Sequence, residues 1–361
     1  MAPSAALPPP SVCLCHLAAR VWAGYNESPE QRGSIRPSGE VEPVASPTEL
    51  PHFAYFEGKI VPYAEARVGV ATHALNYGTG AFAGLRGYWN QEQEQLYIFR
   101  PRDHFVRLLN SAKMLCCNVD LTPEALTDLS LQVVRAEGYR RDCYVRPLIY
   151  KASEVIGVRL HDLRDAVTIY SVPFSKYIER DDDAHVTFSS WRRVDDNAIP
   201  ARGKIIGAYV NSAFIKTDAA RSGFDEVLVL TQEGHVSEAS AMNIFMVRDG
   251  RLITPPVTEN ILEGITRRSI MELAREELGL EVVERPIDRT EVYVCDEFFL
   301  AGTAAQVTAV TQADRRAIGA GVMGPITARL RLLFDDLLRG RVPKYRHWIE
   351  PVYVEVAAPA K

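Results

Sequence analysis

The spacing of apolar residues predicts amphipathic helices in both halves of the chain. Residues 103–114 and 326–337 each place apolar side chains at intervals of three or four, the period of a helix with one buried face. A further helix is predicted from Thr122 to about Gly138, because Thr122 precedes a proline that suits the first helical position.

Two more helices are predicted from their end signals. Residues 211–222 and 266–278 have helical periodicity, and each segment is followed directly by a glycine, Gly223 or Gly279. Glycine favours the left-handed backbone conformation with which helices commonly end. The second half of the chain therefore carries several well-delimited helices.

Short apolar runs between turn residues predict strands. A hairpin is expected around Gly58, and the runs lie at 167–172, 186–190, 226–230, 243–247 and 298–301. Because these strands do not alternate regularly with the helices, the pattern favours an α+β class over a doubly wound sheet.

Composition divides the chain into four parts. Residues 1–50 are rich in Ala, Ser and Pro without periodicity, and we expect a disordered, low-complexity extension. A targeting segment is the alternative interpretation of this part. We expect a small N-terminal α/β lobe at 51–174 and a large C-terminal α+β lobe at 186–361. The polar segment 175–185, with three consecutive Asp, is the expected linker.

Overall charge and cysteine usage narrow the class of protein. The 361 residues are 47% hydrophobic and 24% charged with a net charge of −5, which is typical of a soluble globular enzyme and argues against nucleic acid as a partner. No apolar run has the length of a membrane span. The six cysteines form no Cys-x-x-Cys pair or zinc spacing, so we expect no metal and a reducing, cytoplasmic location.

Two separated residues suggest the chemistry. Lys204 lies in a glycine-flanked apolar stretch, where poor solvation favours the neutral amine that adds to a carbonyl carbon. Glu238 follows a turn and precedes an apolar strand, and a buried acid there would keep the ring nitrogen of a cofactor protonated. Together these roles suggest pyridoxal 5'-phosphate chemistry.

The segments around both residues resemble the fold-type IV pyridoxal-phosphate enzymes, or class IV aminotransferases, and most closely the branched-chain amino acid aminotransferases. The similarity runs from about Phe53 to about Ile349. It implies the two-lobed D-amino acid aminotransferase-like fold and a homodimer or higher homo-oligomer in which the partner subunit completes the active site. The reaction it implies moves the amino group of leucine, isoleucine or valine to 2-oxoglutarate.

The resemblance also assigns cofactor-binding positions. Lys204 would be both covalent anchor and catalytic acid/base, Tyr209 would bind the phenolic oxygen, and Glu238 the ring nitrogen. The phosphate would lie at the start of a helix and a small-residue turn, where backbone N–H groups favour a dianion. The residues expected there are Arg107, Leu262, Gly264, Ile265, Thr266 and Thr303.

Matching motifs in both halves imply a substrate pocket. Aromatic side chains would accommodate an aliphatic substrate, and hydroxyl or guanidinium groups would hold its carboxylate. The residues expected in this pocket are Tyr77, Phe82, Arg86, Tyr144, Arg146, Tyr177, Ala304 and Ala305.

Two departures from the branched-chain pattern affect substrate choice. Ala83 stands where that group usually has Glu, and the loop at 154–160, which contains Arg159, is only partly similar. These residues favour the alternative of a D-amino acid or (R)-amine transaminase. An aminodeoxychorismate lyase and a non-catalytic metabolite-binding protein are further alternatives. The Tyr144-x-Arg146-Pro147 segment argues against the lyase, and the retained Lys204 and Glu238 argue against the binding protein.

Overall fold

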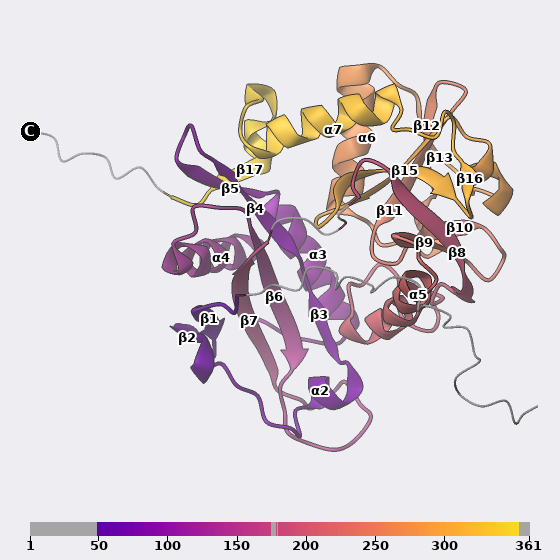
Figure 1. Cartoon of the computed structure of the whole chain (residues 1–361). Helices are drawn as coiled ribbons and strands as arrows, with labels where there is room; N and C mark the ends of the chain where they lie inside the picture. The colour runs from indigo at the N-terminus through magenta and orange to yellow at the C-terminus, as the bar shows by residue number, and fades with distance from the viewer. Residues whose placement is uncertain (1–48, 175–177, 179, 354–361) are drawn as a thin grey trace, which may run out of the picture. The chain divides into compact units, whose positions relative to one another are not determined.

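The computed structural model describes residues 49–174, 178 and 180–353, which belong to one compact unit (Figure 1). The predicted extension at 1–50 lies outside the described residues except for its last two positions. Within the described part, the strands form two sheets, and helices pack against both of them.

The first sheet has eight strands in the order β17-β5-β4-β6-β7-β1-β2, with β3 paired to β6. All the pairings in this sheet are antiparallel. The predicted hairpin is confirmed, with Phe56 opposite Lys59. The strands are β1 (Phe53–Phe56), β2 (Lys59–Pro62), β3 (Gly80–Phe82), β4 (Leu85–Asn90), β5 (Gln95–Phe99), β6 (Cys143–Lys151), β7 (Asp165–Pro173) and β17 (Ile349–Pro351).

The last strand departs from the division expected from the sequence. β17 lies within 186–361 but pairs with β5 of the first sheet. The division at 175–185 into two lobes otherwise stays a prediction, and four residues of that segment lie outside the described ranges.

Three helices accompany the first sheet: α2 (His73–Tyr77), α3 (Pro101–Met114) and α4 (Pro123–Glu137). The signals at the ends of α4 act as predicted. The Thr122 side chain accepts a hydrogen bond from the Ala125 N–H at 3.1 Å, and Gly138 ends the helix in the left-handed region at φ 69°. α3 buries Phe105 and Leu108 completely, and each such burial stabilises the fold by about 1.5–3 kcal/mol.

The second sheet has nine strands in the order β10-β9-β8-β15-β14-β11-β12-β13, with β16 paired to β15. It mixes parallel pairs (β8 with β9 and β15, β12 with β13) with antiparallel ones, so the predicted α+β class is confirmed. The strands are β8 (Ala184–Arg192), β9 (Glu226–Leu230), β10 (Val236–Ala239), β11 (Asn243–Arg248), β12 (Arg251–Thr254), β13 (Val282–Glu284), β14 (Glu297–Gly302), β15 (Gln306–Ala313) and β16 (Arg316–Ala317).

Three helices accompany the second sheet: α5 (Tyr209–Arg221), α6 (Ile265–Leu278) and α7 (Pro325–Leu338). Gly279 ends α6 at φ 64°, as its position predicted. The buried Glu297 carboxylate binds the start of α7, accepting from the N–H groups of Ile326 at 3.0 Å and Thr327 at 2.7 Å.

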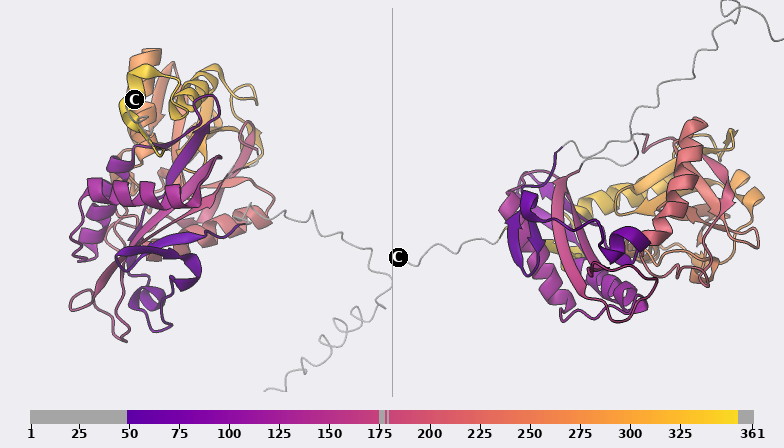
Figure 2. Two further views of the ribbon diagram at one scale, coloured as in Figure 1. Left: turned by 90° about the vertical axis from the view of Figure 1, so that its left-hand side faces the viewer. Right: turned by 90° about the horizontal axis from the view of Figure 1, so that it is seen from below.

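One hydrophobic core joins elements of both sheets. Tyr88 and Phe99, from β4 and β5, share a cluster with Phe299 and Phe334 of the second half, and the rings of Phe99 and Phe334 meet edge to face at 5.3 Å. Figure 2 shows the yellow C-terminal segment beside a strand of the first half, in agreement with the pairing of β17 and β5. Residues of both sheets therefore share one core within the unit.

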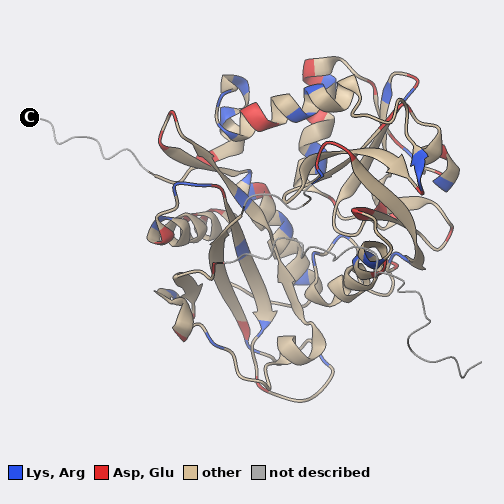
Figure 3. Cartoon of the chain, in the orientation of Figure 1, with Lys and Arg blue, Asp and Glu red and all other residues tan. Residues whose placement is uncertain are grey.

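Charged residues lie mainly on helices and loops, while the strands of both sheets are mostly uncharged (Figure 3). That distribution follows from the burial of the strands, since ions are costly to remove from water. Among the described residues, no helix has the length and apolar character needed to cross a membrane.

Candidate active site

A cavity of about 560 Å³ is lined by residues from both halves of the chain. Its volume lies in the range of small-molecule sites. β3, α3 and β6 contribute to it from the first half, and α5, β10, α6 and the turn after β14 contribute from the second. Lys204 is one of its lining residues.

Local backbone contacts place Lys204 against the first half. Its N–H donates to Ser111 Oγ of α3 at 3.0 Å, and its carbonyl accepts from the Phe82 N–H at 3.0 Å. Nearby, Gly78 and Gly207 approach so closely that a Cβ on Gly78 would lie 2.8 Å from the Gly207 Cα. A side chain at Gly78 would therefore push the lysine segment away from α2.

The Lys204 amine has an environment that favours its neutral form. Its Nζ lies 2.6 Å from the Tyr209 hydroxyl oxygen and 4.9 Å from the centre of the Phe82 ring. Desolvation, with the nearby charge of Arg107, lowers the pKa of Lys204 from 10.5 to about 7. Burial raises the pKa of Tyr209 to about 12, so that hydroxyl keeps its proton at neutral pH.

Glu238 enters the same cavity from β10. The register between β10 and β9 shifts at Val236 and Glu238, a bulge of the kind that redirects a side chain. Glu238 is buried, with only 4% of the residue exposed. One carboxylate oxygen, Oε1, lies 2.9 Å from Arg193 Nη2, and the other accepts from the Leu262 N–H at 3.0 Å. A buried, well-held carboxylate therefore faces the cavity.

The start of α6 provides the expected anion cradle. Gly264 precedes the helix with no side-chain cap, and the next residues of the cradle, Ile265 and Thr266, also line the cavity. A Cβ on Gly264 would lie 2.0 Å from Asn243 Oδ1, so only glycine fits there. The free N–H groups of a helix start attract anions.

Arg107 adds a cation beside this helix start. Its Nη1 donates to the Glu263 carbonyl at 3.0 Å, and the residue lines the cavity. Burial lowers the pKa of Arg107 to about 10, so its guanidinium remains charged at neutral pH. Thr303, in the turn after β14, lines the same cavity.

The predicted substrate residues divide into two groups. Phe82, Tyr144, Arg146 and Ala304 line the cavity. Arg146 Nη2 donates to the Tyr144 hydroxyl at 3.0 Å, and its guanidinium lies 4.5 Å from the centre of the Phe82 ring. This group forms an aromatic wall that carries one cation.

The second group lies elsewhere in this chain. The Tyr77 hydroxyl accepts from the Gly157 N–H at 3.2 Å and does not line the cavity. Ala305 is buried behind the turn, and its carbonyl accepts from the Thr308 hydroxyl. Tyr177 lies outside the described residues.

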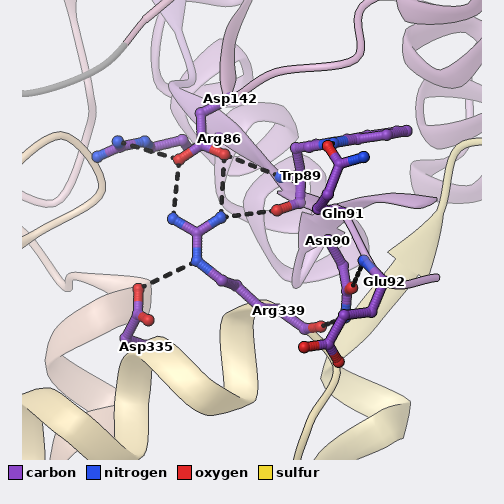
Figure 4. Close-up of polar contacts among 8 residues, drawn as sticks. All are labelled: Arg86, Trp89, Asn90, Gln91, Glu92, Asp142, Asp335 and Arg339. Carbon is purple, nitrogen blue, oxygen red and sulfur yellow. Dashed lines mark hydrogen bonds and ion pairs between the residues drawn. The ribbon is translucent and has the colours of Figure 1, made fainter. Parts of the chain in front are cut away.

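Arg86 does not line the cavity either, and its guanidinium lies against Asp142 (Figure 4). Its Nη1 donates to the Ala304 carbonyl at 3.1 Å, and its Nη2 lies 3.6 Å from Asp142 Oδ2. Asp142 is bound in turn by Arg339 at 3.2 Å. Arg86 thus supports the turn that lines the cavity instead of lining it.

Several residues of the site were not among those predicted. Gly84 gives room to the Tyr144 hydroxyl, since a Cβ there would lie 2.0 Å from that oxygen. Arg193 and Asn243 bind Glu238, and Ser111 binds the Lys204 backbone. Asn243 is five residues from Glu238 in the same motif, which is a usable signal. Arg193 carries no such signal, because only the folding of the second sheet brings it to Glu238.

Comparison with known proteins identifies the family. The model of the family described as "Amino-transferase class IV" matches residues 81–313. The chain belongs to the class IV aminotransferases. It is 44% identical to the "Probable branched-chain-amino-acid aminotransferase" of Aquifex aeolicus (strain VF5), over 83% of this chain and 97% of that protein.

Solved structures of the class agree in fold. The branched-chain aminotransferase of Thermoproteus uzoniensis with norvaline has a TM-score of 0.80 at 39% identity, over 84% of this chain and 100% of that one. The branched-chain amino acid aminotransferase of Thermobaculum terrenum in its PLP form has a TM-score of 0.81 at 38% identity, over 84% and 99%. The expected class IV aminotransferase fold, and with it transaminase activity, is confirmed.

Proposed function

We propose that this aminotransferase moves the amino group of L-leucine, L-isoleucine or L-valine to 2-oxoglutarate, with pyridoxal 5'-phosphate as cofactor. The observation that carries the proposal is that Lys204, Glu238 and the start of α6 line one cavity. An amine, an acid and an anion cradle are the groups that this cofactor requires. The names of the relatives support the choice of substrate.

The residues present fit the cofactor. The start of α6 has no side-chain cap that would compete with an anion, and Arg107 adds a positive charge beside it. Lys204 would hold the cofactor covalently, Tyr209 and Glu238 its ring, and Leu262, Gly264, Ile265, Thr266 and Thr303 would surround its phosphate. When bound, the cofactor would supply an electron-withdrawing ring that stabilises negative charge at the substrate α-carbon.

Lys204 would also carry protons. An amine whose pKa is about 7 both accepts and releases a proton at neutral pH, which suits a general acid/base. The Tyr209 hydroxyl, 2.6 Å away, orients Nζ, and the Phe82 ring shields it from water. Nζ is therefore placed to hold a proton taken from the substrate α-carbon.

Arg146 and Tyr144 would recognise the acidic end of a substrate. The guanidinium is mostly surrounded by the Phe82 and Tyr144 rings, which face it at 4.5 and 5.1 Å. A carboxylate would pair with this cation, and an aliphatic side chain would lie against the rings. This wall suits both a branched aliphatic donor and the dicarboxylate 2-oxoglutarate.

The structure weakens the argument for the alternative transaminases. Ala83 is 1% exposed and does not line the cavity, and Arg159 is exposed on the loop at 154–160. Neither residue that favoured a D-amino acid or (R)-amine donor contacts the cavity within this chain. We therefore keep the branched-chain donor as the proposal.

A second copy of the chain would complete the assembly. Val70, Ile156 and Val158 are 87%, 78% and 90% exposed, and a backbone bridge between Thr72 and Glu154 joins their segments. Exposed apolar residues that cluster in this way are typical of interfaces. We call Val70, Ile156 and Val158 the loop patch and propose that it is covered by the partner in a homodimer.

A cytoplasmic location is supported by the thiols. The four cysteines in the described part of the chain, Cys116, Cys117, Cys143 and Cys295, are all free. Free cysteines are usual in reducing compartments.

A donor panel tests the proposed function. Purified protein loaded with pyridoxal 5'-phosphate is mixed with L-leucine, L-valine, D-alanine or (R)-1-phenylethylamine, and the cofactor absorbance is followed through one turnover. Fast change with the two L-amino acids alone supports the proposal. Faster change with D-alanine or the amine would contradict the branched-chain assignment.

A further inference from the structure

The carboxylate of Glu238 is nearly saturated with hydrogen-bond donors. Oε2 accepts from the Leu262 N–H at 3.0 Å and from Asn243 Nδ2 at 3.3 Å. Oε1 lies 2.9 Å from Arg193 Nη2. An ionised carboxylate offers about four lone-pair positions, two on each oxygen. In the described part of the chain, three of these positions are taken, and the remaining one is on Oε1.

Arg193 is itself held at several points. Its N–H donates to the Leu230 carbonyl at 2.9 Å, and its Nε donates to the Asn260 carbonyl at 3.1 Å. The Arg193 side chain is 11% exposed and the Glu238 side chain 5%. Because both partners are buried, water screens their charges little. The guanidinium is therefore a fixed positive charge in contact with the oxygen that remains open.

The charge of Arg193 also reaches the amine side of the cavity. The negative charge of Glu238 raises the pKa of the Tyr209 hydroxyl, and the positive charge of Arg193 lowers it. This hydroxyl contacts Lys204 Nζ. Besides burial, Arg107 from α3 and Arg146 from β6 lower the pKa of the Lys204 amine, and Tyr144 from β6 raises it, as does Glu238.

We propose that Arg193 is a positioning residue that leaves a single lone pair of Glu238 Oε1 for the cofactor ring nitrogen and, by its charge, limits how strongly that carboxylate binds it. The inference rests on the proposed function, because it concerns the same cofactor. A ring N–H shares Oε1 with the guanidinium, so its direction is set by the ion pair. The negative charge of Glu238 would therefore act on the ring together with the opposite charge of Arg193.

The experiment compares Arg193→Gln, Arg193→Lys and Glu238→Gln with wild type, using the bound cofactor as its own probe. Arg192→Gln is the matched control, since Arg192 is its exposed neighbour and the last residue of β8. Two quantities are measured: the dissociation constant of pyridoxal 5'-phosphate, and the pH midpoint of the absorbance change of the bound cofactor. Thermal unfolding of each variant reports any purely structural effect.

The two charge-removing changes should act in opposite directions. Loss of the positive charge in Arg193→Gln should raise the pH midpoint by about one unit, and the dissociation constant of the cofactor should fall or stay the same, because Glu238 is then no longer opposed. Loss of the negative charge in Glu238→Gln should lower the midpoint. Arg193→Lys keeps the charge and should stay close to wild type in its midpoint, as should Arg192→Gln.

Several results would overturn the inference. An unchanged midpoint in Arg193→Gln, with only a lower unfolding temperature, would give Arg193 a structural role alone. A fall in the midpoint, as in Glu238→Gln, would mean that it merely holds Glu238 in place. Arg193→Lys moving as far as Arg193→Gln would contradict the role of charge. Failure of the wild type itself to bind the cofactor would instead refute the proposed function.

Discussion

The cofactor side and the substrate side of the cavity differ in how well their residues could be predicted. All nine cofactor-side residues expected from the sequence, among them Lys204, Glu238 and Thr266, line the cavity. On the substrate side, Phe82, Tyr144, Arg146 and Ala304 line it, but Arg86 and Ala305 lie behind it. A cofactor is bound by local features, such as a helix start, whereas a substrate wall depends on how distant segments pack.

The largest expected effect concerns the cofactor side. Lys204→Ala removes the covalent anchor and the proton carrier together, so turnover should fall by at least about 10⁴-fold. Steady-state formation of L-glutamate from 2-oxoglutarate measures it. Lys113→Ala is the control, since Lys113 is exposed on α3 and does not line the cavity. Turnover of Lys204→Ala near that of the control would refute the role of Lys204.

A second change tests whether the substrate side needs a partner copy. Val158→Asp places a charge in the loop patch, and burying that charge is costly enough to separate a dimer. We expect a monomer by analytical ultracentrifugation and a loss of activity of roughly tenfold or more. Val322→Asp is the control, because Val322 is 67% exposed in another part of the chain. A dimer that persists in Val158→Asp would exclude the loop patch as the interface.

The pH dependence of cofactor binding tests the environment of the amine. The pKa of Lys204 is lowered, so the protonated, unreactive form predominates below about pH 7 and the neutral form above it. The association rate of pyridoxal 5'-phosphate with cofactor-free protein should therefore fall about tenfold per pH unit below 7 and level off above it. Stopped-flow absorbance gives this rate. A midpoint near the ordinary lysine value of 10.5 would contradict the desolvated environment.

The smallest expected effect concerns the turn behind the substrate side. Arg86→Lys keeps a charge near Asp142 but loses the planar fork that also reaches the Ala304 carbonyl. The KM for L-leucine should rise about fivefold, with kcat changed little, since the turn would be less well placed. Equal losses in kcat and kcat/KM would indicate a role in the chemical step instead.

The same contrast explains which parts of the fold were predictable. α4 and α6 carry their end signals in the sequence, at Thr122 and Gly138 and at Gly279, and the structure confirms both. β10 and β15 were not predicted. Their residues are buried on both faces and give no alternation, so only pairing with distant strands defines them.

The candidate site shows this limit most clearly at Arg193 and Tyr77. The ion pair of Arg193 with Glu238 joins residues 45 positions apart: Arg193 directly follows β8, Glu238 lies on β10, and β9 lies between these two strands in the sheet. Tyr77 was expected in the pocket, but in one chain it binds the loop at 154–160. Neither contact follows from residue type or spacing.

The most direct test of the central claim is to trap the bond between the cofactor and the chain. Wild-type protein loaded with pyridoxal 5'-phosphate is reduced with borohydride and digested, and the modified peptide is found by mass spectrometry. The account predicts one phosphopyridoxyl group, on Lys204 alone. Modification of a different lysine, or of none, would contradict it.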